Sequence, residues 1–267
     1  MGSFQPADTW LPPMQNIFIT GASSGLGRAM AQFYARQDAR LALIGRREDA
    51  LQELVNSLTG QHICYALDVR DHDALRRAAY DFIEHCNGKV DVVLACAGIS
   101  VGTLTEHVED IQVFKAVFDT NVLATAATFE PFIAAMRKRA AGRLVGISSV
   151  AAIRGLPGAG AYSASKAAVM TYCESLRVEL ARDGIDVITI APGYIDTAMT
   201  RHNPYPMPFL MYADQFAKRA AVAIERGVSY TVIPWQMGIV AKLLRLLPNA
   251  IYDRLLGNRA RKPRKQP

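Results

Sequence analysis

Short apolar runs alternate along the chain with longer segments in which apolar residues recur every three or four positions. Several of the short runs are almost entirely apolar, which is typical of strands in a parallel sheet covered on both faces. This rhythm predicts an α/β fold: a doubly wound, seven-stranded parallel sheet with helices on both faces and an extra C-terminal helical segment. The strands are expected at Asn16–Thr20, Arg40–Ile44, His62–Leu67, Val90–Ala95, Gly142–Ser148, Asp186–Ala191 and Tyr230–Pro234, and the longest helix at roughly Asp110–Arg139.

The chain has 267 residues, a normal length for a single α/β domain. We predict one domain over residues 15–258, an N-terminal arm over 1–14 and a basic tail over 259–267. No linker, repeat or second domain interrupts the pattern.

The composition is that of a globular protein with a sizeable core, since 51% of the residues are hydrophobic. Cys64, Cys86, Cys96 and Cys173 form no Cys-x-x-Cys pair, and the five histidines show no ligand spacing. We therefore predict reduced thiols and no metal site. The net charge of +6 comes partly from the tail. Because no DNA-binding motif or aromatic–basic interleaving accompanies it, we predict no nucleic-acid partner.

Three glycines follow the first predicted strand. Gly21, Gly25 and Gly27 stand in a Gly-x-x-x-Gly-x-Gly spacing and open a helical pattern. A strand, a glycine turn and a helix N-terminus in this order allow the backbone to approach the pyrophosphate of a dinucleotide, as in Rossmann-like folds. Taken alone, the motif could also be a simple turn.

Tyr162 and Lys166 stand one helical turn apart, and Ser149 precedes the tyrosine. A phenol titrates near pH ~10, and a fixed ammonium on the same helix face would lower its pKa. Such a tyrosine suits general acid–base catalysis of a carbonyl–alcohol interconversion. The spacing also occurs by chance in solvent-exposed helices, so its weight comes from its combination with the glycine motif.

In these motifs and their order, the chain resembles the short-chain dehydrogenase/reductase family over roughly residues 15–235. The match also includes Asp68-Val69, Asn121 and the segment Pro192-Gly193-Tyr194-Ile195-Asp196-Thr197. One departure is the run Ala95-Cys96-Ala97-Gly98, where the family usually has Asn-Asn-Ala-Gly. This departure bears on local stability more than on activity.

The resemblance implies a catalytic set of Ser149, Tyr162, Lys166 and Asn121. Tyr162 would exchange a proton with the substrate oxygen, and Lys166 would lower its pKa and bind the nicotinamide ribose. Ser149 would orient the substrate carbonyl, and Asn121 would hold a water in a proton relay. The predicted cofactor-binding residues are Gly21, Ser23, Ser24, Gly25, Leu26, Gly27, Arg46, Arg47, Asp68, Val69, Ala97, Gly98, Tyr162, Lys166, Pro192, Gly193, Ile195 and Thr197.

The end of the second predicted strand bears on the choice of cofactor. An NAD enzyme places an acidic residue there to bond the ribose 2′-hydroxyl, but this chain has Gly45 followed by Arg46 and Arg47. Arginine binds phosphate bidentately, so the pair predicts a clamp for the 2′-phosphate of NADP(H), helped by Ser23 and Ser24. The alternative is a pair of solvated arginines at the start of a helix.

The segment after Gly193 is expected to form a lid over the substrate, at about residues 194–228. Its methionines and aromatic residues suit an apolar, lipid- or steroid-like molecule, although they could instead pack the lid onto the domain. We predict an NADP(H)-dependent oxidoreductase that interconverts a carbonyl and a secondary alcohol. The alternatives are a catalytically silent NADP(H)-binding regulator and a ketoacyl reductase acting on acyl carrier protein.

C-terminal helices are expected at about residues 235–257, where two apolar segments precede the basic tail. The apolar side of Met237–Leu247 is expected to bury against the domain or a second copy in a homodimer or homotetramer, with the tail disordered. The alternative is a weak peripheral membrane contact. No stretch approaches the ~18 uncharged apolar residues of a membrane span. The first basic residue is Arg28, so the N-terminus lacks the positive region of a signal peptide, and we predict a cytoplasmic protein.

Overall fold

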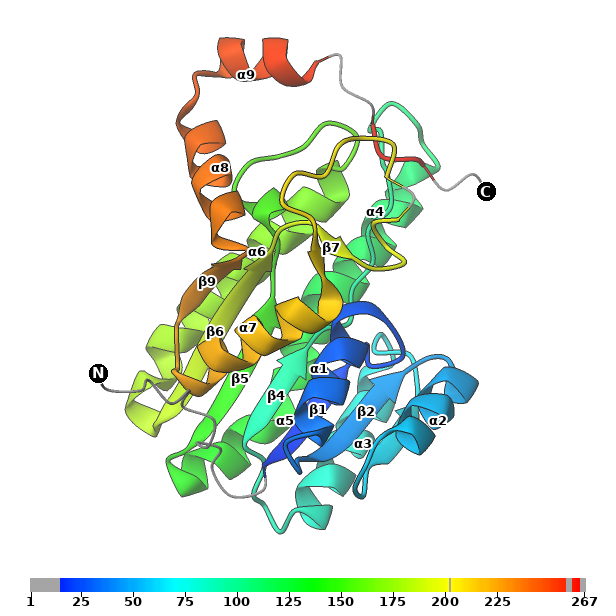
Figure 1. Ribbon diagram of the computed structural model, residues 1–267, viewed down its shortest axis with the longest axis vertical. Helices are drawn as coiled ribbons and strands as arrows, with labels where there is room; N and C mark the ends of the chain where they lie inside the picture. The colour runs from blue at the N-terminus through cyan, green and yellow to red at the C-terminus, as the bar shows by residue number, and fades with distance from the viewer. Residues whose placement is uncertain (1–14, 202, 258–260, 265–267) are drawn as a thin grey trace, which may run out of the picture.

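Seven parallel strands lie side by side in the order β3-β2-β1-β4-β5-β6-β9 in the computed structural model (Figure 1). The structure describes residues 15–201, 203–257 and 261–264, so the predicted arm and most of the predicted tail lie outside it. The strands are β1 (Asn16–Thr20), β2 (Arg40–Gly45), β3 (Ile63–Ala66), β4 (Val92–Ala95), β5 (Gly142–Ile147), β6 (Ile185–Pro192) and β9 (Tyr230–Ile233). The predicted doubly wound parallel sheet is confirmed, and the strand order reverses between β1 and β4.

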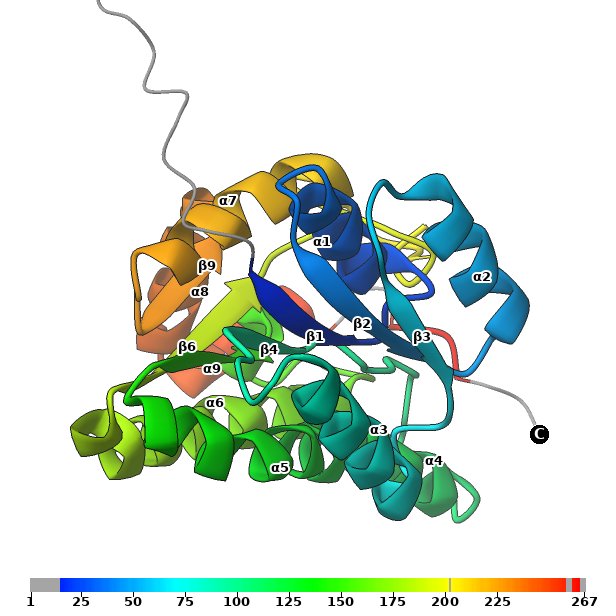
Figure 2. The same ribbon diagram turned by 90° about the horizontal axis from the view of Figure 1, so that it is seen from below.

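Helices cover both faces of this sheet (Figure 2). On one face lie α1 (Gly25–Ala35), α2 (Glu48–Ser57) and α7 (Ala213–Glu225), and on the other lie α3 (His72–His85), α4 (Asp110–Phe118), α5 (Ala124–Arg139) and α6 (Gly160–Leu180). Because both faces are covered, consecutive residues of a strand are buried on opposite sides, which explains the continuous apolar runs.

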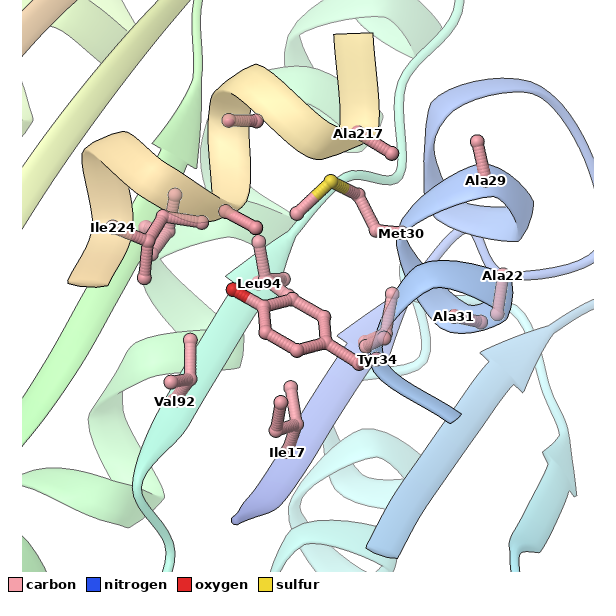
Figure 3. Packing of buried hydrophobic residues seen from close by; sticks show 14 of the residues in the cluster. Ile17, Ala22, Ala29, Met30, Ala31, Tyr34, Val92, Leu94, Ala217 and Ile224 are labelled. Atoms are coloured by element: carbon pink, nitrogen blue, oxygen red, sulfur yellow. The ribbon is translucent and has the colours of Figure 1, made fainter. Parts of the chain in front are cut away.

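Two apolar cores result, one on each face. Figure 3 shows the core under α1 and α7, where the ring of Tyr34 lies between Leu94, Ile17 and Ile224. On the other face, the ring of Phe18 lies 4.8 Å from that of Phe132. Burying side chains of this size contributes about 1.5–3 kcal/mol each.

The predicted helix at Asp110–Arg139 consists of three consecutive parts. Between α4 and α5, residues Asp119–Leu123 form one π-helical turn. π-helical turns are rare and occur frequently at functional sites. This one contains Asn121.

The predicted lid contains two short strands that the apolar pattern did not indicate. β7 (Ile195–Asp196) and β8 (Met211–Tyr212) pair in parallel, and α7 follows directly. Each strand has only two residues, too few for a periodic signal.

The C-terminal helices α8 (Trp235–Leu246) and α9 (Asn249–Leu256) lie beyond the carboxyl end of the sheet (Figure 1). Only a narrow side of α8 is buried, at Met237, Gly238 and Ala241. The expected burial of its apolar side is therefore only partly met within one chain. Residues 261–264 lie close to the start of α4, where Arg264 pairs with Glu109 and Asp110. The expectation of a disordered tail is wrong for these four residues.

Candidate active site

A cleft opens at the carboxyl ends of the strands, where the strand order reverses. Parallel α/β sheets bind ligands at this position, because the loops there diverge. Of the twenty sequence-predicted site residues, all but Arg47 and Asn121 line the cleft. The lining also includes residues that the sequence did not mark, namely Gly45, Leu67, Cys96, Ile99, Thr120, Ile147, Ser148, Ala198, Met199 and Thr200.

The glycine turn brings the backbone of β1 against the start of α1. Gly21 has φ +70° and lies so close to the backbone of Ala97 that a side chain would come within 2.9 Å of it. A side chain at Gly27 would overlap the carbonyl of Gly21. The N-cap residue Ser24 makes no side-chain hydrogen bond to the helix. The first N–H groups of α1 are therefore not occupied by this side chain. A pyrophosphate site requires such unoccupied N–H groups at a helix N-terminus.

The two arginines after β2 have different environments. Arg46 lines the cleft, whereas Arg47 Nη2 donates to the carbonyl of Ser23 at 3.0 Å. Across the cleft, Asp68 binds Arg70 at 2.7 Å. Hydrogen bonds from Arg70 lower the pKa of Asp68, and Arg46 adds a smaller effect in the same direction.

Ser149, Tyr162 and Lys166 meet at the inner end of the cleft. Tyr162 and Lys166 lie on α6, and Ser149 follows β5 as the cap of a short 3-10 turn, Val150–Ala152. Lys166 Nζ donates to the carbonyl of Ile147 at 2.8 Å and lies 6.0 Å from the centre of the Tyr162 ring.

The pKa of Tyr162 differs from the expectation drawn from the sequence. Burial raises the pKa of Tyr162, and a hydrogen bond with Ser149 opposes that rise. Lys166 is not among the causes, because its ammonium is bound to Ile147 rather than to the phenol. Burial also lowers the pKa of Lys166 to about 8. The predicted lowering of the tyrosine pKa by Lys166 is therefore not found in the protein alone.

Asn121 is fully buried behind the catalytic residues rather than in the cleft. Its Oδ1 accepts from the N–H of Ile99 at 2.8 Å, and its Nδ2 donates to the carbonyl of Ile99 and to Ser165 Oγ. Both N–H donors of the amide are thus occupied by the protein. Asn121 joins the loop after β4 to α6, while its role in a water relay stays a prediction.

Two residues beside Tyr162 come from segments that gave no catalytic signal. Burial, and to a smaller extent Tyr194 and Tyr162, raises the pKa of Tyr205 in the lid to about 12. Lys262 Nζ lies 5.8 Å from the centre of the Tyr162 ring. No local pattern could have marked Lys262, because its tail contains several equivalent basic residues.

Residues 15–206 match the short chain dehydrogenase family. The chain belongs to this family. It is 37% identical over 242 residues to an uncharacterized oxidoreductase of Myxococcus xanthus (strain DK1622), covering 90% of this chain and 95% of that protein. It is 33% identical over 270 residues to dehydrogenase/reductase SDR family member 7B of Bos taurus, covering 93% and 82%.

Solved structures of the family share the fold. A short-chain dehydrogenase from Streptomyces avermitilis has a TM-score of 0.77 at 26% identity, covering 91% of this chain and 95% of the other. A short chain dehydrogenase from Mycobacterium paratuberculosis (TM-score 0.73, 24% identity, 83% and 96% covered) is bound to NAD. ElxO (TM-score 0.74, 25% identity, 82% and 97% covered) is bound to NADP.

Membership shows that the chain is an oxidoreductase of a family that uses nicotinamide dinucleotides. Within the described ranges, no helix combines the length and apolar character needed to cross a bilayer. The same residues contain no group of three or more His, Cys, Asp or Glu side chains placed to hold a metal ion.

Proposed function

We propose that the protein is an NADP(H)-dependent oxidoreductase that interconverts a carbonyl and a secondary alcohol. The observation that carries this proposal is that Ser149, Tyr162 and Lys166 meet in the same cleft that the glycine turn lines. A catalytically silent regulator has no need of a partly buried phenol bonded to a serine, so we prefer the enzyme.

In the proposed reaction, the bound nicotinamide supplies or accepts the hydride. Ser149 and Tyr162 together bind the substrate oxygen, and the Tyr162 hydroxyl gives up or takes the proton. Lys166 would bind the nicotinamide ribose with its ammonium, which donates to the carbonyl of Ile147 in the protein alone. A cationic neighbour then favours the phenolate, which lowers the raised pKa of Tyr162.

The preference for NADP(H) rests on the end of β2. Gly45 offers no carboxylate to a ribose 2′-hydroxyl, while Arg46 lines the cleft and makes no hydrogen bond or ion pair with any of the described residues. Arg47 is bound to the carbonyl of Ser23 and shapes the loop beside it. A guanidinium at this place suits a 2′-phosphate. The solved relatives bound to NAD and to NADP do not by themselves favour either cofactor for this chain.

The proposed substrate carries a substantial apolar part. Met199 of the lid lines the cleft, and Phe209 and Leu210 lie half-exposed on the same segment. We expect a cytoplasmic homodimer or homotetramer, with the exposed apolar side of α8 covered by a second copy. The net charge of +6 would also suit an acidic acyl carrier protein, but part of that charge comes from the basic tail.

A substrate screen that follows nicotinamide absorbance tests the proposal. Purified full-length protein is offered ketones and secondary alcohols of increasing chain length, with NADPH, NADH and their oxidised forms. We expect turnover of apolar ketones with NADPH preferred. Absence of turnover across the panel, together with intact cofactor binding, would support the regulator instead.

A further inference from the structure

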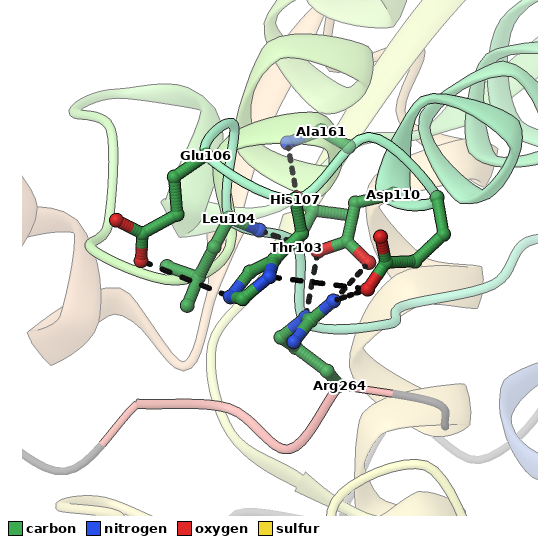
Figure 4. Close-up of polar contacts among 8 residues, drawn as sticks. Thr103, Leu104, Glu106, His107, Asp110, Ala161 and Arg264 are labelled. Carbon is green, nitrogen blue, oxygen red and sulfur yellow. Dashed lines mark hydrogen bonds and ion pairs between the residues drawn. The ribbon is translucent and has the colours of Figure 1, made fainter. Parts of the chain in front are cut away.

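The described part of the tail, residues 261–264, is held in one place by backbone and side-chain contacts. The N–H of Gly102 donates to the carbonyl of Pro263 at 3.1 Å, and a side chain at Gly102 would overlap the carbonyl of Lys262. Arg264 binds the carboxylates of Asp110 and Glu109, each at 2.8 Å (Figure 4). Because Asp110 is itself buried and also accepts from the N–H of Leu104, this anchor is part of the folded domain.

The anchor determines where Lys262 lies. Its Nζ donates to Ser100 Oγ at 2.7 Å, in the loop that follows β4, and lies 5.8 Å from the centre of the Tyr162 ring. An ammonium has three donors, and the hydroxyl of Ser100 takes one of them. No ion pair joins Lys262 to any of the described residues, and burial without an acidic neighbour lowers its pKa to about 8.

A partly buried ammonium without a counter-ion is destabilised until an anion binds beside it. On the structure of this chain, we propose that Lys262 binds an anionic group of the substrate, a carboxylate or a phosphate, and so determines specificity beside the catalytic tyrosine. The inference rests on the proposed function and narrows its substrate class. The substrate is then amphipathic, with its apolar part under the lid and its anionic group near Ser100 and Lys262.

The test compares anionic ketones with neutral partners of the same skeleton in full-length protein. Medium-chain oxo acids are paired with their methyl esters, and hydroxyacetone phosphate with hydroxyacetone, so that carboxylate and phosphate are distinguished. Lys262→Met removes the charge at nearly constant volume, and Lys262→Arg retains it. Arg261→Met is the matched control, because Arg261 is an exposed neighbour in the same segment.

We expect Lys262→Met to lower kcat/KM for the preferred anionic substrate at least tenfold and to change kcat/KM for its neutral partner less than twofold. Lys262→Arg should retain most of the wild-type kcat/KM for the anionic substrate. Equal effects on anionic and neutral substrates would overturn the inference while leaving the proposed function intact.

A measurement without turnover separates the two proposals. Calorimetric titration of the cofactor-loaded protein with hexanoate and with inorganic phosphate should show binding of at least one probe, weakened at least fivefold by Lys262→Met and unchanged by Arg261→Met. If a probe binds in this way but the protein turns over no ketone, the anion site is retained and the proposed function is rejected. Binding of neither probe, or binding independent of Lys262, would overturn the inference.

Discussion

The guanidinium carbon of Arg154 lies 3.7 Å from the centre of the Tyr252 ring, which joins the loop after Ser149 to helix α9. The same guanidinium donates to the carbonyls of Leu244 and Leu247 at the end of α8. The last carbonyls of a helix lack partners within it, so Arg154 acts as a cap for α8. Tyr252 in turn donates its hydroxyl to the carbonyl of Gly155 at 2.6 Å. One side chain thus holds both C-terminal helices against the substrate side of the domain.

Arg154→Met should lower the free energy of unfolding by about 2 kcal/mol, because it removes charged hydrogen bonds and a cation–π contact. Urea unfolding of the variant and of wild type measures the difference. Arg226→Met provides the control, since Arg226 is exposed at the end of α7. A loss no larger than that of the control would contradict the capping role.

Tyr162→Phe should retain cofactor binding and lower kcat about a thousandfold, because only the transferable proton is removed. Steady-state kinetics and a cofactor titration measure the two effects separately. Turnover within about tenfold of wild type, a difference of roughly 1.4 kcal/mol, would remove Tyr162 from its proposed role.

Arg46→Ala should weaken NADPH binding about tenfold or more and leave NADH binding nearly unchanged, because only NADPH carries the 2′-phosphate. Arg47→Ala should weaken both cofactors moderately, since Arg47 supports the Ser23 loop. Dissociation constants of both cofactors are compared with those of Arg219→Ala, an exposed site on α7. Equal losses for NADPH and NADH in Arg46→Ala would mean that Arg46 does not contact that phosphate.

Lys166 should make the stability of the protein without cofactor depend on pH. Burial lowers its pKa from 10.5 to about 8, so between these values the unfolded chain binds the proton and the folded chain does not. Stability contributed by this group is therefore lowest below pH ~8 and rises toward pH ~10.

Lys166→Met removes that dependence. The difference in unfolding free energy, variant minus wild type, should be about 2 kcal/mol more positive at pH 7 than at pH 10. Lys138→Met, at an exposed position of α5, should show no such change. A difference that is independent of pH would show that Lys166 titrates alike in both states.

Four apolar residues of α8 are exposed along one side of the helix: Trp235, Ile239, Leu243 and Leu246. Residues spaced by three or four share a helix face, so they form a continuous stripe suited to a second copy. Ile239→Glu with Leu243→Glu should shift the protein to monomers in sedimentation analysis, whereas Tyr80→Glu on α3 should not. If wild type is already monomeric and sediments with anionic vesicles through this stripe, the membrane alternative is the better one.

Much of the fold and of the site could be predicted because the signals are local. Continuous apolar runs reveal strands buried on both faces, and Gly21 and Gly27 reveal the turn because no other residue fits that backbone. Tyr162 and Lys166 could be paired because one helical turn separates them on any α-helix. Gly45 and Arg46 likewise mark the end of β2. The sequence did not show which of the two arginines lines the cleft.

The tertiary structure alone decided which distant segments meet. Lys262 lies 162 residues from Ser100 in the chain, and Arg264 lies 154 residues from Asp110, separations at which no periodicity links two positions. The pKa of Lys166 is also a tertiary property, because burial in the folded domain lowers it, and the spacing from Tyr162 does not reveal that burial. Local sequence determines backbone conformation and side-chain facing, whereas long-range packing determines which charges are left without a partner.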